Sequence, residues 1–418
     1  MICAAPLRIS DIMKTDPAGA EGHILSAASI CNEWRDKMNG PEPFPHPIYV
    51  TQPLLPDLQD YCDMLRQVWE SRLLTNNGPM AKRLESELAK YLCVPHLSLF
   101  SNGTIALQIA CRLLRLKGEV ITTPFTFAAT THALYLNDLK PVFCDVEEET
   151  LTMDPDRVEE LITPDTCAIL PVHVYGNPCK VERLQKIADK HGLKIIYDAA
   201  HAFGVEIDGI PVGSYGDISM FSLHATKIYH TIEGGALAFK SPGLKERSDQ
   251  LRNFGIVKED HINEPGTNGK LNEIQAAMGL LLLDKVDEEI IRRKEITYLY
   301  RDLLRNVPGI RTGEDQDGVK HNYPYFVIRV DHKEYGLSRD ELQKGLREYN
   351  VFSRRYFYPL CSHFRCYRDL YSARAGNLPV AERSAEEVLV LPLYGGLKNE
   401  DVEKICSVIG HIRSGGNG

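Results

Sequence analysis

The spacing of hydrophobic residues changes along the chain from a helical pattern to short apolar runs. Residues 58–72 and 80–91 carry apolar side chains every three or four positions, which predicts two amphipathic helices. From residue 97 onward, short apolar runs closed by turn residues predict buried strands. These runs lie at residues 97–100, 119–122, 141–144, 168–174, 194–197, 218–223 and 236–239. Helical segments are predicted between most of them, at residues 104–116, 127–137, 155–161 and 181–191.

This alternation of strands and helices predicts an α/β fold with a mainly parallel sheet covered on both faces. Ligands of such folds bind beyond the carboxyl ends of the strands, so the residues directly after each apolar run are the candidates for chemistry. A long helix is predicted over residues 272–304, with a buried apolar stripe. Its stripe is formed by Ile274, Met278, Leu281, Leu282 and Val286.

The pattern beyond this helix is mixed and predicts a second, smaller α+β domain. Residues 323–330 alternate like a half-buried strand, residues 339–349 look helical, and residues 388–392 look like a strand. We therefore expect a large domain over residues 46–295 and a small C-terminal domain over residues 296–418. Residues 1–45 are predicted to be an extension with a short helix around residues 26–38, and we assign them no function.

Composition narrows the class of protein. The 418 residues are 43% hydrophobic and 25% charged, the balance of an ordinary globular protein. No apolar stretch approaches the roughly 20 residues that a membrane span needs, and the N-terminus lacks a signal peptide, so we expect a cytoplasmic protein. The net charge of -9 and the lack of a basic run argue against nucleic-acid binding. The 11 cysteines lack the spacing of zinc ligands or of a disulfide framework, so we expect reduced thiols and no metal.

Three short motifs follow predicted strands and carry possible chemistry. Ser101-Asn102-Gly103-Thr104 opens a helix, where free N–H groups and the helix dipole favour an anion, although such a segment is often a simple cap. Asp198 ends a buried strand and needs a partner, which is a metal, the next helix or a cationic heterocycle. Lys227 lies between an apolar strand and Glu233-Gly234-Gly235, where burial would lower its pKa and make it a nucleophile and base.

Together, a phosphate site, an acid for a ring nitrogen and a reactive lysine are the contacts that pyridoxal 5'-phosphate (PLP) requires. The motifs also occur in the order typical of one family. They are Asn77-Gly78-Pro79, residues 101–104, residues 123–130, Asp198-Ala199-Ala200-His201, Gly216-Asp217-Ile218, residues 222–227, residues 233–235 and residues 268–277. From about Leu54 to the C-terminal region, the chain resembles the DegT/DnrJ/EryC1/StrS family of sugar aminotransferases, which are fold-type I PLP enzymes.

The resemblance implies a role for each matched residue. Lys227 would form the Schiff base with PLP and carry protons, and Asp198 would pair with the pyridinium nitrogen. Gly103, Thr104 and Ser222 would hold the phosphate, Phe127 and Ala200 would cover the two ring faces, and His201 would lie near the ring hydroxyl. Asn268 or Lys270 would reach the phosphate of the neighbouring subunit, so the resemblance also implies a homodimer.

The resemblance further implies a reaction, in which L-glutamate donates its amino group to a nucleotide-linked keto sugar. The segment from His224 to Lys227 with Glu233-Gly234-Gly235 is similar to enzymes that aminate C4 of a dTDP-4-keto-6-deoxyhexose. His224, Tyr229 and Asn77 are the predicted substrate contacts. The alternatives are amination at C3 or of another nucleotide-keto sugar, a non-catalytic regulator with this fold, and a metal hydrolase using Asp198 and His201, for which further ligands are lacking.

Overall fold

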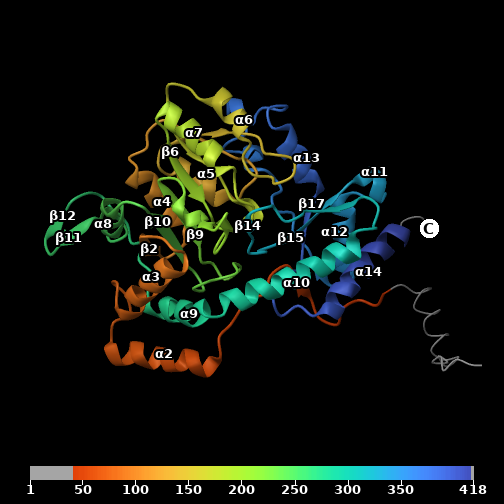
Figure 1. Ribbon diagram of the computed structural model, residues 1–418, viewed down its shortest axis with the longest axis horizontal. Coiled ribbons are helices and arrows are strands. Elements are labelled where there is room, and N and C mark those ends of the chain that lie inside the picture. Colours follow the sequence, from red (N-terminus) through yellow and green to blue (C-terminus); the bar gives the residue numbers. More distant parts are fainter. Residues whose placement is uncertain (1–40, 416–418) are drawn as a thin grey trace, which may run out of the picture. The chain divides into compact units, whose positions relative to one another are not determined.

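A seven-stranded sheet forms the centre of the larger part of the molecule in the computed structural model, which describes residues 41–415 (Figure 1). Its strand order is β2-β10-β9-β6-β5-β3-β4, and β10 is the one strand that runs antiparallel to the other six. The strands are β2 (His96–Phe100), β3 (Glu119–Thr122), β4 (Lys140–Phe143), β5 (Thr166–Leu170), β6 (Lys194–Asp198), β9 (Ile218–Ser222) and β10 (Gly235–Phe239). The mainly parallel sheet confirms the predicted α/β fold.

Helices cover both faces of this sheet, and strand side chains alternate between two hydrophobic cores. In β10, Ala236 and Ala238 face one core, whereas Leu237 and Phe239 face the other. The helices of this part are α2 (Leu58–Ser71), α3 (Pro79–Tyr91), α4 (Gly103–Leu113), α5 (Ala128–Tyr135), α6 (Pro155–Val158), α7 (Val181–His191), α8 (Pro242–Leu251) and α9 (Glu273–Leu283). Because both faces are covered, the carboxyl edge of the sheet is where a ligand can enter.

The long helix predicted over residues 272–304 is two helices, α9 and α10 (Val286–Leu304). The break is at Asp284 and Lys285, where the N–H of Lys285 bonds to the carbonyl of Leu282 in a tightened turn. The apolar stripe continues across the break because Val286 is buried. Hydrophobic spacing therefore cannot reveal the break between α9, which packs beside α3, and α10, which packs beside α14 (Asn399–Gly415).

The C-terminal part contains a three-stranded antiparallel sheet of β13 (Ile310–Thr312), β15 (Phe326–Val330) and β17 (Val388–Leu391). Helices α11 (His332–Tyr335), α12 (Arg339–Glu348), α13 (Pro379–Glu387) and α14 accompany it. The remaining short strands are β1 (Ile48–Tyr49), β7 (Glu206–Ile207), β8 (Ile210–Pro211), β11 (Ile256–Lys258), β12 (His261–Ile262), β14 (Val319–Lys320) and β16 (Val351–Phe352). The mixture of strands and helices agrees with the predicted α+β pattern.

The segment around residue 44 packs against this C-terminal part. Phe44 is buried, its N–H bonds to the carbonyl of Tyr349, and β1 pairs in parallel with β16. The predicted domain boundaries at residues 45 and 295 stay predictions, and α10 runs across the second of them. The helix predicted around residues 26–38 lies outside the described residues. Within residues 41–415, no helix is long and apolar enough to cross a membrane.

Candidate active site

A pocket of about 270 Å³ lies where β2, β6 and β9 end and β10 begins. It brings together residues from five of the predicted motifs. The predicted site residues that line it are Gly103, Thr104, Phe127, Asp198, Ala200, His201, Ser222, His224 and Lys227. These residues are up to 124 positions apart in sequence, as the span from Gly103 to Lys227 shows (227 − 103 = 124). The parallel topology brings them together at the carboxyl edge of the sheet.

The N-terminus of α4 forms one wall of this pocket. The Asn102 side chain caps the helix by accepting the N–H of Ile105 at 2.9 Å. Among the described residues, the N–H groups of Gly103 and Thr104 find no protein acceptor, so they are available to a ligand. A Cβ on Gly235 would lie 2.6 Å from the backbone C and O of Asn102, so glycine is needed there for the turn to sit this close to β10. The arrangement favours a bound phosphate.

Asp198 ends β6 and is buried, with only 4% of its surface exposed. Its Oδ1 accepts the N–H of Ala200 at 3.0 Å, and its Oδ2 accepts the hydroxyl of Thr130 at 2.8 Å. Burial raises the pKa of the carboxyl group, while the bonds from Thr130 and Ala200 and the charge of Lys227 work in the opposite direction. A buried carboxylate of this kind is suited to a cationic partner.

Lys227 is carried on a loop that is closed on itself by backbone hydrogen bonds. The N–H of Ala225 donates to the carbonyl of Ile232 at 2.7 Å, and the N–H of Lys227 donates to the carbonyl of His224 at 2.8 Å. Burial lowers the pKa of Lys227 to about 8, and the negative charge of Asp198 opposes this shift. Near neutral pH a larger share of this amine than of an ordinary lysine is therefore unprotonated, which is the form that a nucleophile or a base requires.

His201 has one ring nitrogen in use and packs against aromatic side chains. Its Nδ1 accepts the N–H of Tyr175 at 3.1 Å, so this nitrogen carries no proton. Burial and the charge of Lys227 hold the pKa of His201 well below its usual value, so the ring is neutral. Its ring lies 5.0 Å from that of Tyr325 and 6.0 Å from that of Phe357, between centroids. His201 therefore offers a neutral imidazole to the pocket.

Three aromatic residues of the C-terminal part complete the pocket and were missed by sequence reasoning. They are Tyr325, Tyr356 and Phe357. The ammonium nitrogen of Lys227 lies 5.9 Å from the centroid of the Tyr325 ring. The aromatic cluster at residues 356–358 was a visible signal, but neither spacing nor strand position connected it to the motifs of the large sheet.

His224 and Phe127 lie at the wall of the pocket as well. The Nδ1 of His224 accepts the N–H of Thr226 at 3.2 Å, so a neutral His224 carries its proton on Nε2, which lies 3.4 Å from the Glu233 carboxylate. Phe127 is 63% exposed in the single chain. An aromatic side chain with this exposure beside a pocket is available to a flat ligand and is not part of the core.

Tyr229, predicted to contact the substrate, lies in the core instead. It is 1% exposed, its hydroxyl donates to the carbonyl of Gly279 at 3.0 Å, and its ring stacks on Phe203 with 4.6 Å between centroids. The neighbouring His230 is also buried and bonds to the carbonyl of Leu54 at 2.8 Å. The Tyr229 hydroxyl and the His230 ring therefore bond inside the protein and do not face a substrate, because the chain enters the core directly after Lys227.

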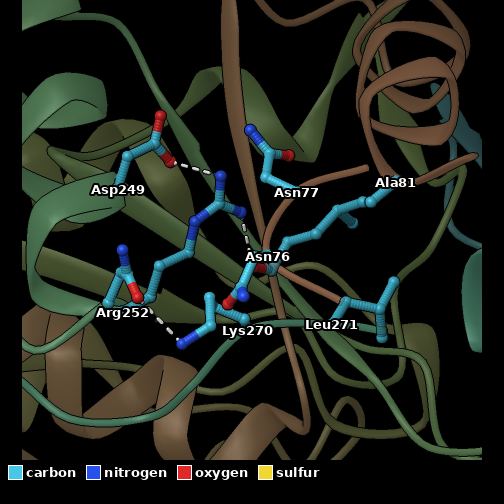
Figure 2. Close-up of a pocket in the computed structure, with 9 residues that line it drawn as sticks. Asn76, Asn77, Ala81, Asp249, Arg252, Lys270 and Leu271 are labelled. Atoms are coloured by element: carbon cyan, nitrogen blue, oxygen red, sulfur yellow. Dashed lines mark hydrogen bonds and ion pairs between the residues drawn. The ribbon is translucent and has the colours of Figure 1, made fainter. Parts of the chain in front are cut away.

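Asn77 and Lys270 line a second, smaller pocket of about 120 Å³ (Figure 2). Figure 2 shows them beside Arg252, whose guanidinium is paired with Asp249 at 2.7 Å. The ammonium group of Lys270 donates to the side-chain oxygens of Asn253 at 2.9 Å and of Asn268 at 2.8 Å. Within one chain, Asn77, Asn268 and Lys270 do not line the larger pocket.

A model of the DegT/DnrJ/EryC1/StrS aminotransferase family matches residues 58–410. The chain belongs to this aminotransferase family. The aminotransferase is 46% identical over 367 residues to the dTDP-4-amino-4,6-dideoxy-D-glucose transaminase of Shigella dysenteriae, covering 88% of this chain and 99% of that protein. A transaminase of the same name from Escherichia coli is 46% identical over 363 residues, covering 87% of this chain and 98% of that protein.

Solved structures show the same fold. DesI, crystallised in the presence of its TDP-sugar product, superimposes on this aminotransferase with a TM-score of 0.86 at 36% identity, covering 91% of this chain and 96% of that one. The relationship confirms both the predicted fold class and the predicted aminotransferase activity. Within residues 41–415, no group of three or more His, Cys, Asp or Glu side chains is placed to hold a metal ion.

Proposed function

We propose that this aminotransferase uses PLP, held in the larger pocket and attached covalently through Lys227. The main support for this proposal is that one pocket of about 270 Å³ contains a buried carboxylate, a lysine of lowered pKa and helix N–H groups without a protein acceptor. Each matches one part of the cofactor: Asp198 the ring nitrogen, Lys227 the aldehyde, and Gly103 with Thr104 the phosphate. Bound PLP supplies an electron-withdrawing ring that makes the carbon–hydrogen bond of an attached amine acidic.

The surrounding residues would orient this cofactor. Ser222 would add a hydroxyl to the phosphate site, Phe127 and Ala200 would cover the two faces of the ring, and His201 would lie near the ring hydroxyl. Asp198, as an anion, favours a protonated ring nitrogen by charge pairing in a buried site. Lys227 moves protons at its Nζ: it accepts the proton from the Cα of the amino donor and returns a proton to the carbon of the acceptor.

We further propose that the active enzyme is a homodimer and that Asn268, rather than Lys270, reaches the phosphate in the partner's pocket. Lys270 donates to the side-chain oxygen of Asn268 at 2.8 Å, which leaves the amide hydrogens of Asn268 for another acceptor. Asn268 is also exposed, whereas Lys270 is half-buried. Lys270 would then orient the Asn268 side chain through this hydrogen bond and would not itself contact the phosphate.

For the reaction, we propose transfer of an amino group from L-glutamate to C4 of a dTDP-4-keto-6-deoxyhexose. The support is the 46% identity to two dTDP-4-amino-4,6-dideoxy-D-glucose transaminases over nearly their whole length. In this chain, His224 and Glu233 lie on either side of the Lys227 loop and line the pocket. His224 Nε2 and the Glu233 carboxylate, which lie 3.4 Å apart here, would turn to sugar hydroxyl groups as donor and acceptor when the substrate binds. Asn77 remains a candidate substrate contact.

The reaction is tested by incubating the PLP-loaded protein with L-glutamate and dTDP-4-keto-6-deoxyglucose and solving the product structure by NMR. We expect an amino group on C4 and stoichiometric 2-oxoglutarate. Amination at C3 of a 3-keto isomer alone would assign the enzyme to the other regiochemical group. No 2-oxoglutarate from glutamate in the half-reaction would refute the catalytic role.

A further inference from the structure

A short chain of hydroxyl groups leads to the buried carboxylate of Asp198. The hydroxyl of Thr130 donates to Oδ2 of Asp198 at 2.8 Å, and the hydroxyls of Thr126 and Thr130 lie 2.8 Å apart. Both threonines are buried, with 3% and 0% of their surface exposed. Thr126 directly precedes Phe127, the extended N-cap residue of α5, and Thr130 lies in the first turn of the helix, so the entry into α5 brings the two hydroxyls together.

Counting protons fixes the direction of this chain. A threonine hydroxyl has one proton to donate and two lone pairs to accept. The proton of Thr130 is used at Asp198, because a carboxylate can only accept. The contact between the two threonines must then be donated by Thr126 to Thr130. All the donors therefore point toward Asp198 as long as Asp198 is ionised.

The second oxygen of Asp198 is held by the backbone. Oδ1 accepts the N–H of Ala200 at 3.0 Å, so each carboxylate oxygen has one fixed donor. Burial raises the pKa of Asp198, and the Thr130 hydroxyl is the first of the groups that counter this rise. Hydrogen bonds to a charged acceptor polarise one another in a buried site, so the outer donor also contributes.

We propose that Thr130, supported by Thr126, is a positioning residue that orients the Asp198 carboxylate and stabilises its negative charge toward a cationic ring nitrogen. This inference rests on the proposed PLP function. Thr130 touches neither the substrate nor the reacting carbon in this scheme and acts only through Asp198. The segment from Thr126 to Thr130 would then have two functions, because Phe127 would contact the cofactor ring while Thr126 and Thr130 hold the Asp198 carboxylate.

Three substitutions and a neighbouring control test this role. Thr130→Val keeps the shape and removes the donor, Thr130→Ser restores a hydroxyl, and Thr126→Val removes only the outer donor. Thr131→Val is the matched control, because Thr131 is equally buried in α5 but its hydroxyl donates to the carbonyl of Ala128. The readouts are the PLP dissociation constant by absorbance titration and the pH dependence of the absorbance of the bound cofactor, besides turnover.

We expect Thr130→Val to weaken PLP binding by roughly ten- to a hundredfold, the range for a lost hydrogen bond to a charged group. The acid limb of the absorbance profile should move to higher pH, since a carboxyl group with one donor fewer is harder to ionise. Thr126→Val should act in the same direction by a few-fold, and Thr130→Ser and Thr131→Val should resemble the natural protein.

Wild-type affinity and an unmoved acid limb in Thr130→Val would overturn the proposal, as would equal losses in Thr130→Val and Thr131→Val. These failures differ from a failure of the proposed function. If the natural protein itself bound no PLP, the cofactor assignment would be wrong. If the natural protein bound PLP normally and Thr130→Val did so equally well, only the positioning role would be wrong.

Discussion

Replacing Gly235 by alanine should damage the phosphate site without removing any of the groups proposed to contact the ligand. The added Cβ would lie 2.6 Å from the backbone C and O of Asn102 and 2.7 Å from the N of Gly103. Ordinary contact begins at 3.4 Å, so the strand or the turn must yield by about 0.8 Å (3.4 − 2.6). The opposing atoms are backbone, so no side chain can rotate away. The N–H groups of Gly103 and Thr104 would move with the turn.

The magnitude follows from two general findings. Overpacking a filled site costs about 1–3 kcal/mol. A misplacement of about 1 Å among catalytic groups costs on the order of a hundredfold in rate, so turnover should fall as well. We therefore expect Gly235→Ala to weaken PLP binding by roughly ten- to a hundredfold and to lower thermal stability modestly. The assays are absorbance titration with PLP and thermal denaturation of the cofactor-free protein.

Gly410→Ala is the control, because a Cβ there meets nothing within 4 Å and the residue lies inside α14, far along the chain from the pocket. This change should stabilise the protein by about 0.5–1 kcal/mol, as alanine does in a helix, and leave PLP affinity unchanged. Wild-type affinity for PLP in Gly235→Ala would refute the reasoning that the closeness of β10 to the Asn102–Gly103 turn shapes the phosphate site.

Three further predictions concern the charged groups and the assembly. Asp198→Asn should fold but lose turnover by several orders of magnitude, since breaking a buried charge pair costs about 3–5 kcal/mol; near-normal kcat would remove Asp198 from its role. Burial lowers the pKa of Lys227 from 10.5 to about 8. The folded protein therefore binds fewer protons than the unfolded chain between these values, and the stability of the cofactor-free protein contributed by Lys227 should rise with pH across that window. Urea denaturation of Lys227→Met should lack this rise, and an identical pH slope in both proteins would contradict it. Mixing inactive Lys227→Ala with an inactive Asn268→Ala protein should restore part of the activity in heterodimers, whereas a catalytically active monomer in sedimentation would exclude a shared site.

The strands of the central sheet could be predicted because each is a short apolar run between turn residues. The runs at 119–122 and 194–197 match β3 and β6 to within a residue. The pocket residues of the large sheet could be predicted for a related reason, since Gly103, Asp198 and Lys227 all follow strands that end at the same edge. Site residues at the carboxyl ends of parallel strands can therefore be found from the order of the motifs along the sequence.

Other features could not be predicted, because they depend on packing between distant segments. Tyr325 and Tyr356 reach the pocket from the C-terminal part, and no local pattern records this approach. Tyr229 is a polar aromatic residue two positions after Lys227, yet its hydroxyl bonds inside the core. The hydrogen bond from Thr130 to Asp198 joins residues 68 positions apart. Thr130 was part of a recognised motif, but this contact is visible only in the three-dimensional structure.

The measurement that tests the central claim most directly is reduction of the PLP-loaded protein with borohydride, followed by proteolysis and mass spectrometry. We expect one modified peptide, with the reduced pyridoxyl-phosphate group on the Nζ of Lys227, and no such peptide from Lys227→Ala. A label on another lysine, or no label on a protein that binds PLP, would contradict the assignment of Lys227.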